Sequence, residues 1–582
     1  MSTGSTGSLL PKWQMAILLG APIALGLGYL YFRNQTTSNL TEESADSTDG
    51  SSTNKKKISN SKEKSISLDG DDKLPKEMVE PKPQTELEKA IAYKNDGNSR
   101  FKSGKFSEAI EFYNKAIETC PKSQPLDLST FYQNRAAAYE QLKKWSAVKE
   151  DCTNALELNS RYIKALFRRA KASENTNDLC ASLEDITATC ILEGFQNQSS
   201  LIFADRVLKE LGRRDAKEAF KNRQVVYPSA NFIKTYFASY SNDPLMTNDA
   251  DENANSGLSR AKMALKDGKY EDIIPACTEE IDSNESDEKR KIEARLLRGT
   301  IYLLLGSLGE ASKDLDYVID SSDADTSVKA NALIKRASLN VQNEQHQKGF
   351  EDFAAAEKLD PSNADVYHQR GQVYVLLEKL DEALADFNMA IELTPHMCSA
   401  LVQKCYAEYR HACLVQNQVQ IYNAIQATHR AADKFPNNIE CYNILAQILS
   451  EQQQFDKADE LFEKAITIQP TQASLYVHRG LLHLQWNGDI KKSLDLLQKA
   501  IDIDEKCELA YETLGTIQVQ RGLLEDAIEL FEKALKLCRS EMEMVHIYSL
   551  RNAAIAQLNV AKQLGLDLSS LSALSATGAA FA

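Results

Sequence analysis

The chain has 582 residues and carries 68 Lys and Arg against 83 Asp and Glu, which gives a formal net charge of −15. This acidic balance argues against a nucleic-acid partner, because binding phosphates needs a local excess of cationic side chains. Eleven cysteines without a Cys-x-x-Cys pair or a Cys/His cluster argue against a disulfide framework and a structural zinc site. Because 24 Gly and 14 Pro supply few turns for a chain of this length, we predict an all-α protein.

The first distinctive element is an uncharged apolar segment at residues 13–32, WQMAILLGAPIALGLGYLYF, between Lys12 and Arg33. As a helix rising about 1.5 Å per residue, it spans about 30 Å, the thickness of the hydrocarbon core of a bilayer. A cleaved signal peptide is the alternative, but it needs a shorter apolar run followed by small residues, and here RNQTT follows. We therefore predict a transmembrane anchor at residues 13–32, preceded by a short tail at residues 1–12.

The orientation of this anchor is not settled by the positive-inside rule, because few cationic side chains lie near it. Glycosylation triplets at Asn34 and Asn39 would suit a lumenal body, whereas unpaired thiols favour the cytosol. We place residues 34–582 in the cytosol. Residues 33–84 are rich in Ser, Thr, Asp, Glu and Lys and nearly lack aromatic residues, so they are predicted to form a disordered polar tether.

The body of the chain contains an internal repeat of 34 residues. Small residues lead successive copies, and the steps from 136 to 170, 337 to 371, 371 to 405 and 446 to 480 each have this length. A second small residue, a large residue and Ala follow at fixed offsets. The clearest sets are Gly97, Ala109, Tyr113, Ala116; Gly371, Ala383, Phe387, Ala390; Ala446, Ala458, Phe462, Ala465; and Gly515, Ala527, Phe531, Ala534. An amphipathic bundle is the alternative, but it does not require such matched steps.

This pattern resembles the tetratricopeptide repeat, in which small residues let two antiparallel helices approach closely. We predict an all-α tetratricopeptide superhelix of about ten or eleven hairpins in two arrays, with one N-terminal transmembrane helix. The predicted domains are an N-terminal three-repeat domain, a helical and aromatic-rich connector, a longer C-terminal array, and a capping helix with a tail. Their expected ranges are residues 85–193, 194–258, 259–540 and 541–582.

The first three repeats place cationic and amide side chains where the first helix of each unit would face the concave groove. Lys94 and Asn98 are one turn apart, as are Lys164 and Arg168, and Asn134 lies on the intervening unit. Lys and Arg supply charge-assisted hydrogen bonds to a carboxylate, and Asn amides donate without adding charge. A solvated helix surface is the simpler interpretation for any one of these residues. Together they predict a site for an anionic peptide end.

These five residues resemble the two-carboxylate clamp with which tetratricopeptide domains hold the C-terminal Glu-Glu-Val-Asp of cytosolic seventy- and ninety-kilodalton heat-shock chaperones. All five clamp positions match. The resemblance implies that Lys94, Asn98, Asn134 and Lys164 bind the terminal Asp with its main-chain carboxylate. It also implies that Arg168 supports binding further along the peptide.

The corresponding inner positions of the C-terminal repeats mix amides, charges of both signs and apolar groups, which suits longer amphipathic segments. For each of these residues, packed or solvated surface is an equally good interpretation. The candidate groove residues are Gln369, Gln372, Gln403, Tyr406, Arg410, Glu440, Asn443, Gln447 and His478. We expect no metal here, because no second ligand accompanies the histidine at a fixed spacing. We also find no phosphate-binding Gly loop, nucleophile elbow or HExxH motif, so we predict neither an enzyme nor a cofactor.

The order of anchor, tether, clamp domain, connector and second array resembles the seventy-kilodalton receptors of the mitochondrial outer-membrane translocase. The resemblance implies a single-pass protein of the mitochondrial outer membrane with most of its chain in the cytosol. Its implied partners are the chaperones, mitochondrial preproteins whose internal targeting segments enter the C-terminal groove, and other translocase subunits. A chaperone-docking adaptor on the endoplasmic reticulum or peroxisome, and a non-enzymatic scaffold, are the alternatives that the sequence leaves open.

Overall fold

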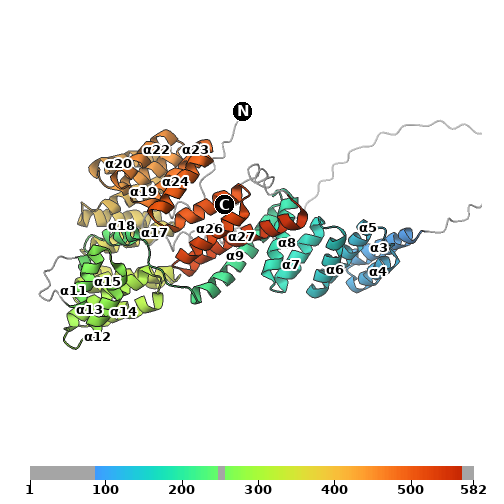
Figure 1. Cartoon of the computed structure of the whole chain (residues 1–582), viewed down its shortest axis with the longest axis horizontal. Coiled ribbons are helices and arrows are strands. Elements are labelled where there is room, and N and C mark those ends of the chain that lie inside the picture. Colours follow the sequence, from blue (N-terminus) through green and yellow to red (C-terminus); the bar gives the residue numbers. More distant parts are fainter. Residues whose placement is uncertain (1–84, 247–255, 567–582) are drawn as a thin grey trace, which may run out of the picture. The chain divides into compact units, whose positions relative to one another are not determined.

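The computed structural model describes residues 85–246 and 256–566 (Figure 1). Within these ranges the chain forms α-helices and two short 3-10 helices, and no β-strand occurs in them. The predicted all-α tetratricopeptide fold is thereby confirmed for the described residues. The tail at 1–12, the anchor at 13–32 and the tether at 33–84 lie outside them. None of the described helices has both the length and the apolar character needed to cross a membrane.

Packing divides the chain into two compact units that meet between Asn177 and Asp178. The helices of the first unit are α3 (Glu86–Lys102), α4 (Phe106–Thr119), α5 (Pro125–Gln141), α6 (Trp145–Leu158) and α7 (Ile163–Asn175). The second unit begins with α8 (Leu179–Leu192), α9 (Gln198–Lys221), α10 (Ala230–Ala238), η1 (Pro244–Met246), α11 (Gly257–Asp267), η2 (Tyr270–Asp272) and α12 (Ile273–Asp282).

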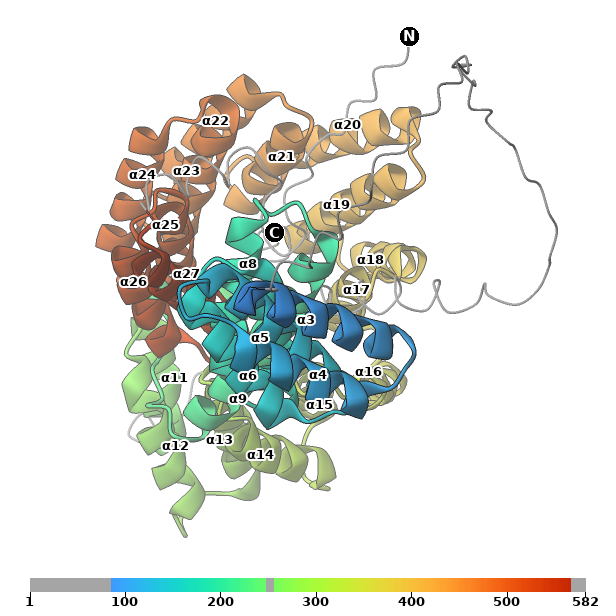
Figure 2. The same cartoon turned by 90° about the vertical axis from the view of Figure 1, so that its right-hand side faces the viewer.

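The second unit continues as a series of helix hairpins that follow one another round a curve (Figure 2). These are α13 (Glu288–Leu304), α14 (Leu308–Asp320), α15 (Thr326–Gln342), α16 (His346–Leu359), α17 (Ala364–Leu376), α18 (Leu380–Leu393), α19 (Cys398–Leu414), α20 (Gln418–Lys434), α21 (Ile439–Glu451), α22 (Phe455–Ile468), α23 (Ala473–Asn487), α24 (Ile490–Ile503), α25 (Glu508–Gln520), α26 (Leu524–Leu537) and α27 (Glu541–Leu564). Among the first helices of these hairpins, α13, α15, α17, α19 and α21 contact one another in succession, as do α23, α25 and α27. These helices line the inner, concave side (Figure 2).

The small residue that leads the repeat explains how the two helices of several hairpins come close together. A Cβ atom on Gly371 would lie 2.7 Å from Cε1 of Phe387, whose ring is fully buried. Only hydrogen at this position lets the ring fill the space between the two helices. Gly97 against Tyr113 and Gly515 against Phe531 repeat this arrangement. The sequence pattern of a small residue followed by a large one therefore reports direct contact within a hairpin.

A second repeating contact joins the same two helices, and the sequence analysis did not identify it. Arg370 forms a bidentate ion pair with Asp386, with Nε and Nη2 each 2.8 Å from a carboxylate oxygen. The Arg directly precedes the small residue that leads the repeat, and the Asp follows the Arg by 16 residues. The same spacing pairs Arg135 with Asp151, Arg298 with Asp314, and Arg336 with Asp352. This spacing is readable in the sequence.

Two segments from opposite ends of the second unit pack together. Helix α27 contacts α26, α8 and α9 (Figure 1), although α9 and α27 are more than 300 residues apart in sequence. A Cβ atom on Gly212 of α9 would lie 2.5 Å from Oγ of Ser549, so glycine permits this close approach. Asn552 of α27 donates a hydrogen bond of 2.8 Å to Asp215 of α9. The last helix therefore packs against the array and also against the connector.

Candidate functional site

The predicted clamp residues lie on the first helices of three successive hairpins, all within the first unit. Lys94 and Asn98 are on α3, Asn134 is on α5, and Lys164 and Arg168 are on α7. Helix α5 contacts both α3 and α7. The fold therefore places the five residues on one row of adjacent helices, in the order that the repeat predicts.

The two asparagines are in direct contact. Nδ2 of Asn134 donates to Oδ1 of Asn98 across 3.3 Å, and the hydroxyl of Tyr113 donates to the same oxygen across 2.8 Å. Because Asn134 and Tyr113 both donate to the Asn98 oxygen, the Asn98 amide is held in one orientation. Its NH2 group stays available for a further hydrogen bond. Tyr113 is also the ring that packs on Gly97, so hairpin packing orients this amide. Asn98 and Asn134 therefore offer amide N–H donors to a ligand, and neither side chain carries a charge.

Arg168 is held by a carboxylate that the sequence analysis did not identify. Its Nε donates to Glu140 of α5 across 2.7 Å, and Lys171 of α7 donates to the other oxygen across 2.8 Å. Burial opposes ionisation of Glu140, but the hydrogen bonds from Lys171 and Arg168 outweigh it and lower the pKa of this carboxyl. Nη1 of Arg168 is buried and lacks a hydrogen-bond partner among the described residues. The guanidinium is therefore fixed in place with one donor group unused.

Lys94 and Lys164 complete the set from the two outer helices of the row. Lys94 is half-buried one turn from Asn98, and Lys164 is exposed one turn from Arg168. Neither forms an ion pair with another residue of the part that the structure describes. The structure thus joins Asn98 to Asn134 directly and ties Arg168 to α5, while the two ammonium groups stay available to an anion.

The candidate residues of the second groove lie on inner helices of the second unit. Gln369 and Gln372 are on α17, and the others follow on α19, α21 and α23. Most of them are buried, whereas Arg410, Glu440 and Asn443 are half-buried. Most of these side chains are therefore covered by other atoms of the protein.

Several of these side chains bind one another. Gln403 donates to Glu440 across 3.1 Å, which joins α19 to α21. Within single helices, Arg410 donates to the hydroxyl of Tyr406, and Gln447 donates to Asn443. Gln369 instead donates to Ser239, the residue that directly follows α10, across 3.5 Å. The sequence placed these residues along one inner row but did not predict this contact with the connector.

The same inner face contains buried polar atoms that have no hydrogen-bond partner in the described part of the chain. They include Oε1 of Gln369, Oε1 of Gln372, and Nδ1 of His368 and His478. Burial lowers the pKa of His478 to about 3, so this imidazole is neutral at physiological pH. Burial also raises the pKa of Glu440 to about 7, against the hydrogen bond from Gln403. The candidate residues that a ligand can reach on this face are therefore the half-buried Arg410, Glu440 and Asn443.

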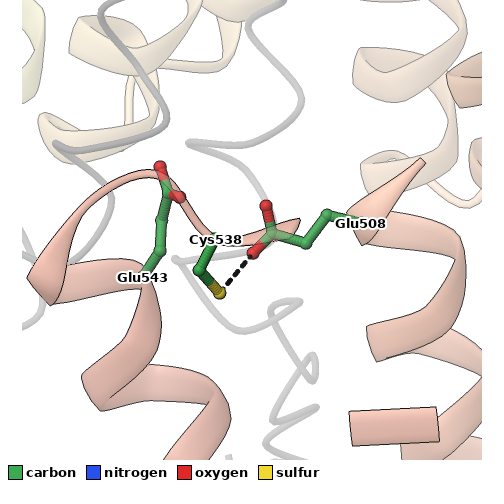
Figure 3. A group of neighbouring side chains, drawn as sticks. All are labelled: Glu508, Cys538 and Glu543. Atoms are coloured by element: carbon green, nitrogen blue, oxygen red, sulfur yellow. Dashed lines mark hydrogen bonds between the residues drawn. The ribbon is translucent and has the colours of Figure 1, made fainter. Parts of the chain in front are cut away.

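One group of side chains in the described residues has the composition of a metal site: Glu508, Cys538 and Glu543 (Figure 3). Sγ of Cys538 lies 3.3 Å from Glu508, as the dashed line shows. The Glu543 carboxylate accepts from the backbone N–H groups of Arg539 and Ser540, where it caps the first turn of α27. Burial raises the pKa of Glu508 to about 8. Hydrogen bonds within the protein explain why these three side chains lie close together, so we assign the group a structural role.

The chain is similar in sequence and in fold to several known proteins. The tetratricopeptide repeat family matches residues 90–123, 364–397, 439–472 and 509–541. The chain is 46% identical to the mitochondrial import receptor subunit TOM70 of Homo sapiens, over 96% of this chain and 93% of that protein. Its identity to the TOM70 subunit of Saccharomyces cerevisiae (strain ATCC 204508 / S288c) is 26%, over 81% of this chain and 80% of that protein. Among solved structures it is similar to the crystal structure of yeast Tom70, with 25% identity, 82% and 99% coverage, and a TM-score of 0.47.

Proposed function

We propose that this chain, which belongs to the family of the mitochondrial import receptor subunit TOM70, receives chaperone-bound preproteins through two separate sites. The first site is the clamp of α3, α5 and α7, which binds the C-terminal end of cytosolic seventy- and ninety-kilodalton chaperones. The second is the concave face of the α17–α23 hairpins, which binds internal targeting segments of preproteins. The protein acts by binding and transfer, without catalysis or a cofactor.

The observation that carries the proposal is the set of unpaired donors on the inner helices of the first unit. Lys94 and Lys164 are cations without an internal acid partner, in a chain whose net charge is −15. Asn98 and Asn134 add two amide groups, which a hydrogen bond between them holds in place. A peptide terminus that ends in Asp carries two carboxylates, and each can accept charge-assisted hydrogen bonds worth about 1.5–3 kcal/mol. Several such bonds are sufficient for micromolar affinity.

Arg168 contributes differently from the lysines in this proposal. Glu140 already holds its Nε, so an incoming acidic side chain meets a guanidinium that is fixed in position and only partly neutralised. Because the side chain is ordered before binding, less rotamer entropy is lost when the peptide arrives. This geometry suits a contact with an acidic residue upstream of the terminal Asp.

The second site is proposed for segments with both polar and apolar groups. Its inner face combines the amides of Gln372 and Gln447, the carboxylate of Glu440 and the ring of Tyr406. The half-buried Glu440 would favour cationic side chains in a bound segment.

We place the protein in the mitochondrial outer membrane, with the segment at residues 13–32 as a single-pass anchor and the two units in the cytosol. The polar stretch at residues 33–84 would then serve as a tether above the membrane. Other translocase subunits are the proposed recipients of the preprotein, because a receptor without catalytic machinery must pass its client onward. Membership of the TOM70 family favours this location over the endoplasmic reticulum or peroxisome.

The proposal is tested by capture of chaperones from cytosol on the immobilised full chain in detergent micelles. A free peptide that ends in Glu-Glu-Val-Asp should release the captured chaperones. The same peptide with an amidated C-terminus is the matched control and should not release them, because it lacks the main-chain carboxylate that Lys94, Asn98, Asn134 and Lys164 are proposed to bind. Equal release by both peptides would contradict the clamp.

A further inference from the structure

The connector between α9 and α11 enters the concave side of the second unit. Helix α10 begins after Ser229, whose side chain accepts from the N–H of Phe232. Its apolar face carries Ile233, Tyr236 and Phe237, all nearly fully buried. These side chains belong to the same hydrophobic core as the inner helices α13, α15 and α17. The connector is therefore packed as part of the array.

A fully buried ion pair fastens this segment to α15. Nζ of Lys335 donates to Asp243 across 3.0 Å, and both side chains are 0–1% exposed. The ammonium group also lies 5.3 Å from the ring centre of Tyr240 and 5.7 Å from that of Phe237. Removing one partner of such a pair strongly destabilises a fold, because the other charge stays buried. The ion pair therefore anchors the connector to α15.

The next inner helix holds the same segment through backbone groups. The carboxylate of Asp365 on α17 accepts from the N–H of Ser241 across 2.6 Å and from the N–H of Asn242 across 3.1 Å. Ser239 accepts from Gln369, one turn further along α17. The inner faces of α15 and α17 are therefore covered at these positions by the chain's own segment.

The other end of α10 reaches the far side of the curve. Nδ2 of Asn231 donates to the carbonyl of Thr471, in the turn before α23, across 2.6 Å. The ring of Phe232 lies 4.1 Å from the guanidinium carbon of Arg539, in the turn before α27. Helix α10 and the residues that follow it thus connect α17 to the turn before α23, three hairpins further along the chain.

The face of α10 that does not pack on α15 is polar and open. Lys234, Thr235 and Ala238 are exposed, and Asn231 beside them is half-buried. Their spacing of three to four residues puts them on one side of the helix. This side cannot lie against α15, because Ile233, Tyr236 and Phe237 occupy that contact.

We propose that α10 and the following turn form a strut across the concave side of the second unit, and that its exposed side chains, Lys234, Thr235 and Ala238, form one wall of the preprotein site. The inference rests on the proposed function of the groove. The strut closes the α15 end of the concave side, so a preprotein segment lies between α10 and the inner helices α19, α21 and α23. The bound segment contacts α10 on one side and residues such as Asn443 on the other.

The test is photo-crosslinking from single p-benzoylphenylalanine residues in the full chain, in detergent micelles. The probe is a biotinylated synthetic 20-residue amphipathic peptide of Leu, Arg and Ser. The photoreactive residue is placed at Ala238 on the strut, at Asn443 on α21, or at the exposed Lys313 on α14 as a control. Circular dichroism confirms that each variant is folded. We expect peptide adducts from Ala238 and Asn443 and only background from Lys313.

The outcomes separate the two proposals. Adducts from Asn443 without adducts from Ala238 would overturn the strut as a wall while leaving the groove in place. Adducts from neither position would overturn the proposed preprotein site, and the wall with it. Adducts from Ala238 alone would place the peptide on α10 but outside the groove, which also overturns the inference.

A charge reversal gives a second, independent measurement. Lys234→Glu replaces a cation facing the bound peptide, so the Arg-containing probe should bind about two- to fivefold more tightly at low salt. Lys217→Glu on α9 makes the same change in net charge away from the groove and is the matched control. Equal effects of the two substitutions would contradict a wall at Lys234.

Discussion

Arg168→Ala is the substitution that most sharply separates a working clamp from a solvated helix surface. In the structure Glu140 accepts a hydrogen bond from Nε of Arg168, and 20% of the Arg168 side chain stays exposed. An acidic peptide side chain can therefore form one further charge-assisted bond, worth about 1.5–3 kcal/mol. Its loss corresponds to a decrease in peptide affinity of about ten- to 150-fold.

The same substitution should leave the fold intact. Glu140 keeps its hydrogen bond from Lys171 when Arg168 is removed, so no buried carboxylate is left without a cation. We expect the free energy of unfolding to fall by less than about 2 kcal/mol. A change of affinity in this variant would therefore report on binding and not on unfolding.

The assay is calorimetric titration of the full chain in detergent micelles with a peptide that ends in Glu-Glu-Val-Asp. Arg169→Ala is the matched control, since it removes the same charge at the next residue, whose Nη1 donates to Thr153. Arg168→Ala should lose the stated affinity, and Arg169→Ala should stay within about twofold of the parent protein. Equal affinities of Arg168→Ala and the parent protein would refute the role assigned to Arg168.

Three further predictions concern the fold that carries the two sites. Gly371→Ala should lower the free energy of unfolding by about 1–3 kcal/mol, because the new Cβ meets Phe387, and adding Phe387→Leu should recover part of this loss in urea titrations. Arg370→Ala should cost about 3 kcal/mol in the same assay, since it leaves the buried Asp386 without its bidentate partner; an unchanged midpoint would show that the pair is dispensable. Because burial lowers the pKa of His478 to about 3, the unfolded chain gains a proton first as the pH falls below 6.5, so this residue should remove about 2 kcal/mol of stability between pH 7 and pH 5. His478→Gln should reduce that loss, and the same pH dependence in both proteins would contradict a buried neutral imidazole.

The repeat could be predicted from the sequence because the contacts that define it are local. A small residue and its aromatic partner, such as Gly371 and Phe387, are 16 residues apart and recur with the period of the hairpin. The Arg370–Asp386 pair has the same separation and would have been found by the same search for repeated offsets. Periodicity also assigns residues such as Asn98 to the first helix of a unit, which is where the structure has them.

Contacts between distant segments carry no such periodic signal. Asn231 and Thr471 are 240 residues apart, and Lys335 and Asp243 are 92 apart, and neither pair repeats along the chain. The partner of Arg168 was missed for a related reason, because Glu140 lies near the end of its helix and outside the positions that the clamp motif specifies. The burial of Gln369 beneath α10 likewise follows from tertiary packing and not from its place in the repeat.

Zero-length crosslinking provides the most direct measurement of where a chaperone tail binds. A carbodiimide joins a peptide carboxylate to an ammonium group only when the two are in contact, and mass spectrometry of the digested full chain then identifies the modified lysines. With a peptide ending in Glu-Glu-Val-Asp, we predict that the crosslinks fall on Lys94 and Lys164. Crosslinks confined to lysines of the second unit, with both of these residues unmodified, would contradict a carboxylate clamp on α3, α5 and α7.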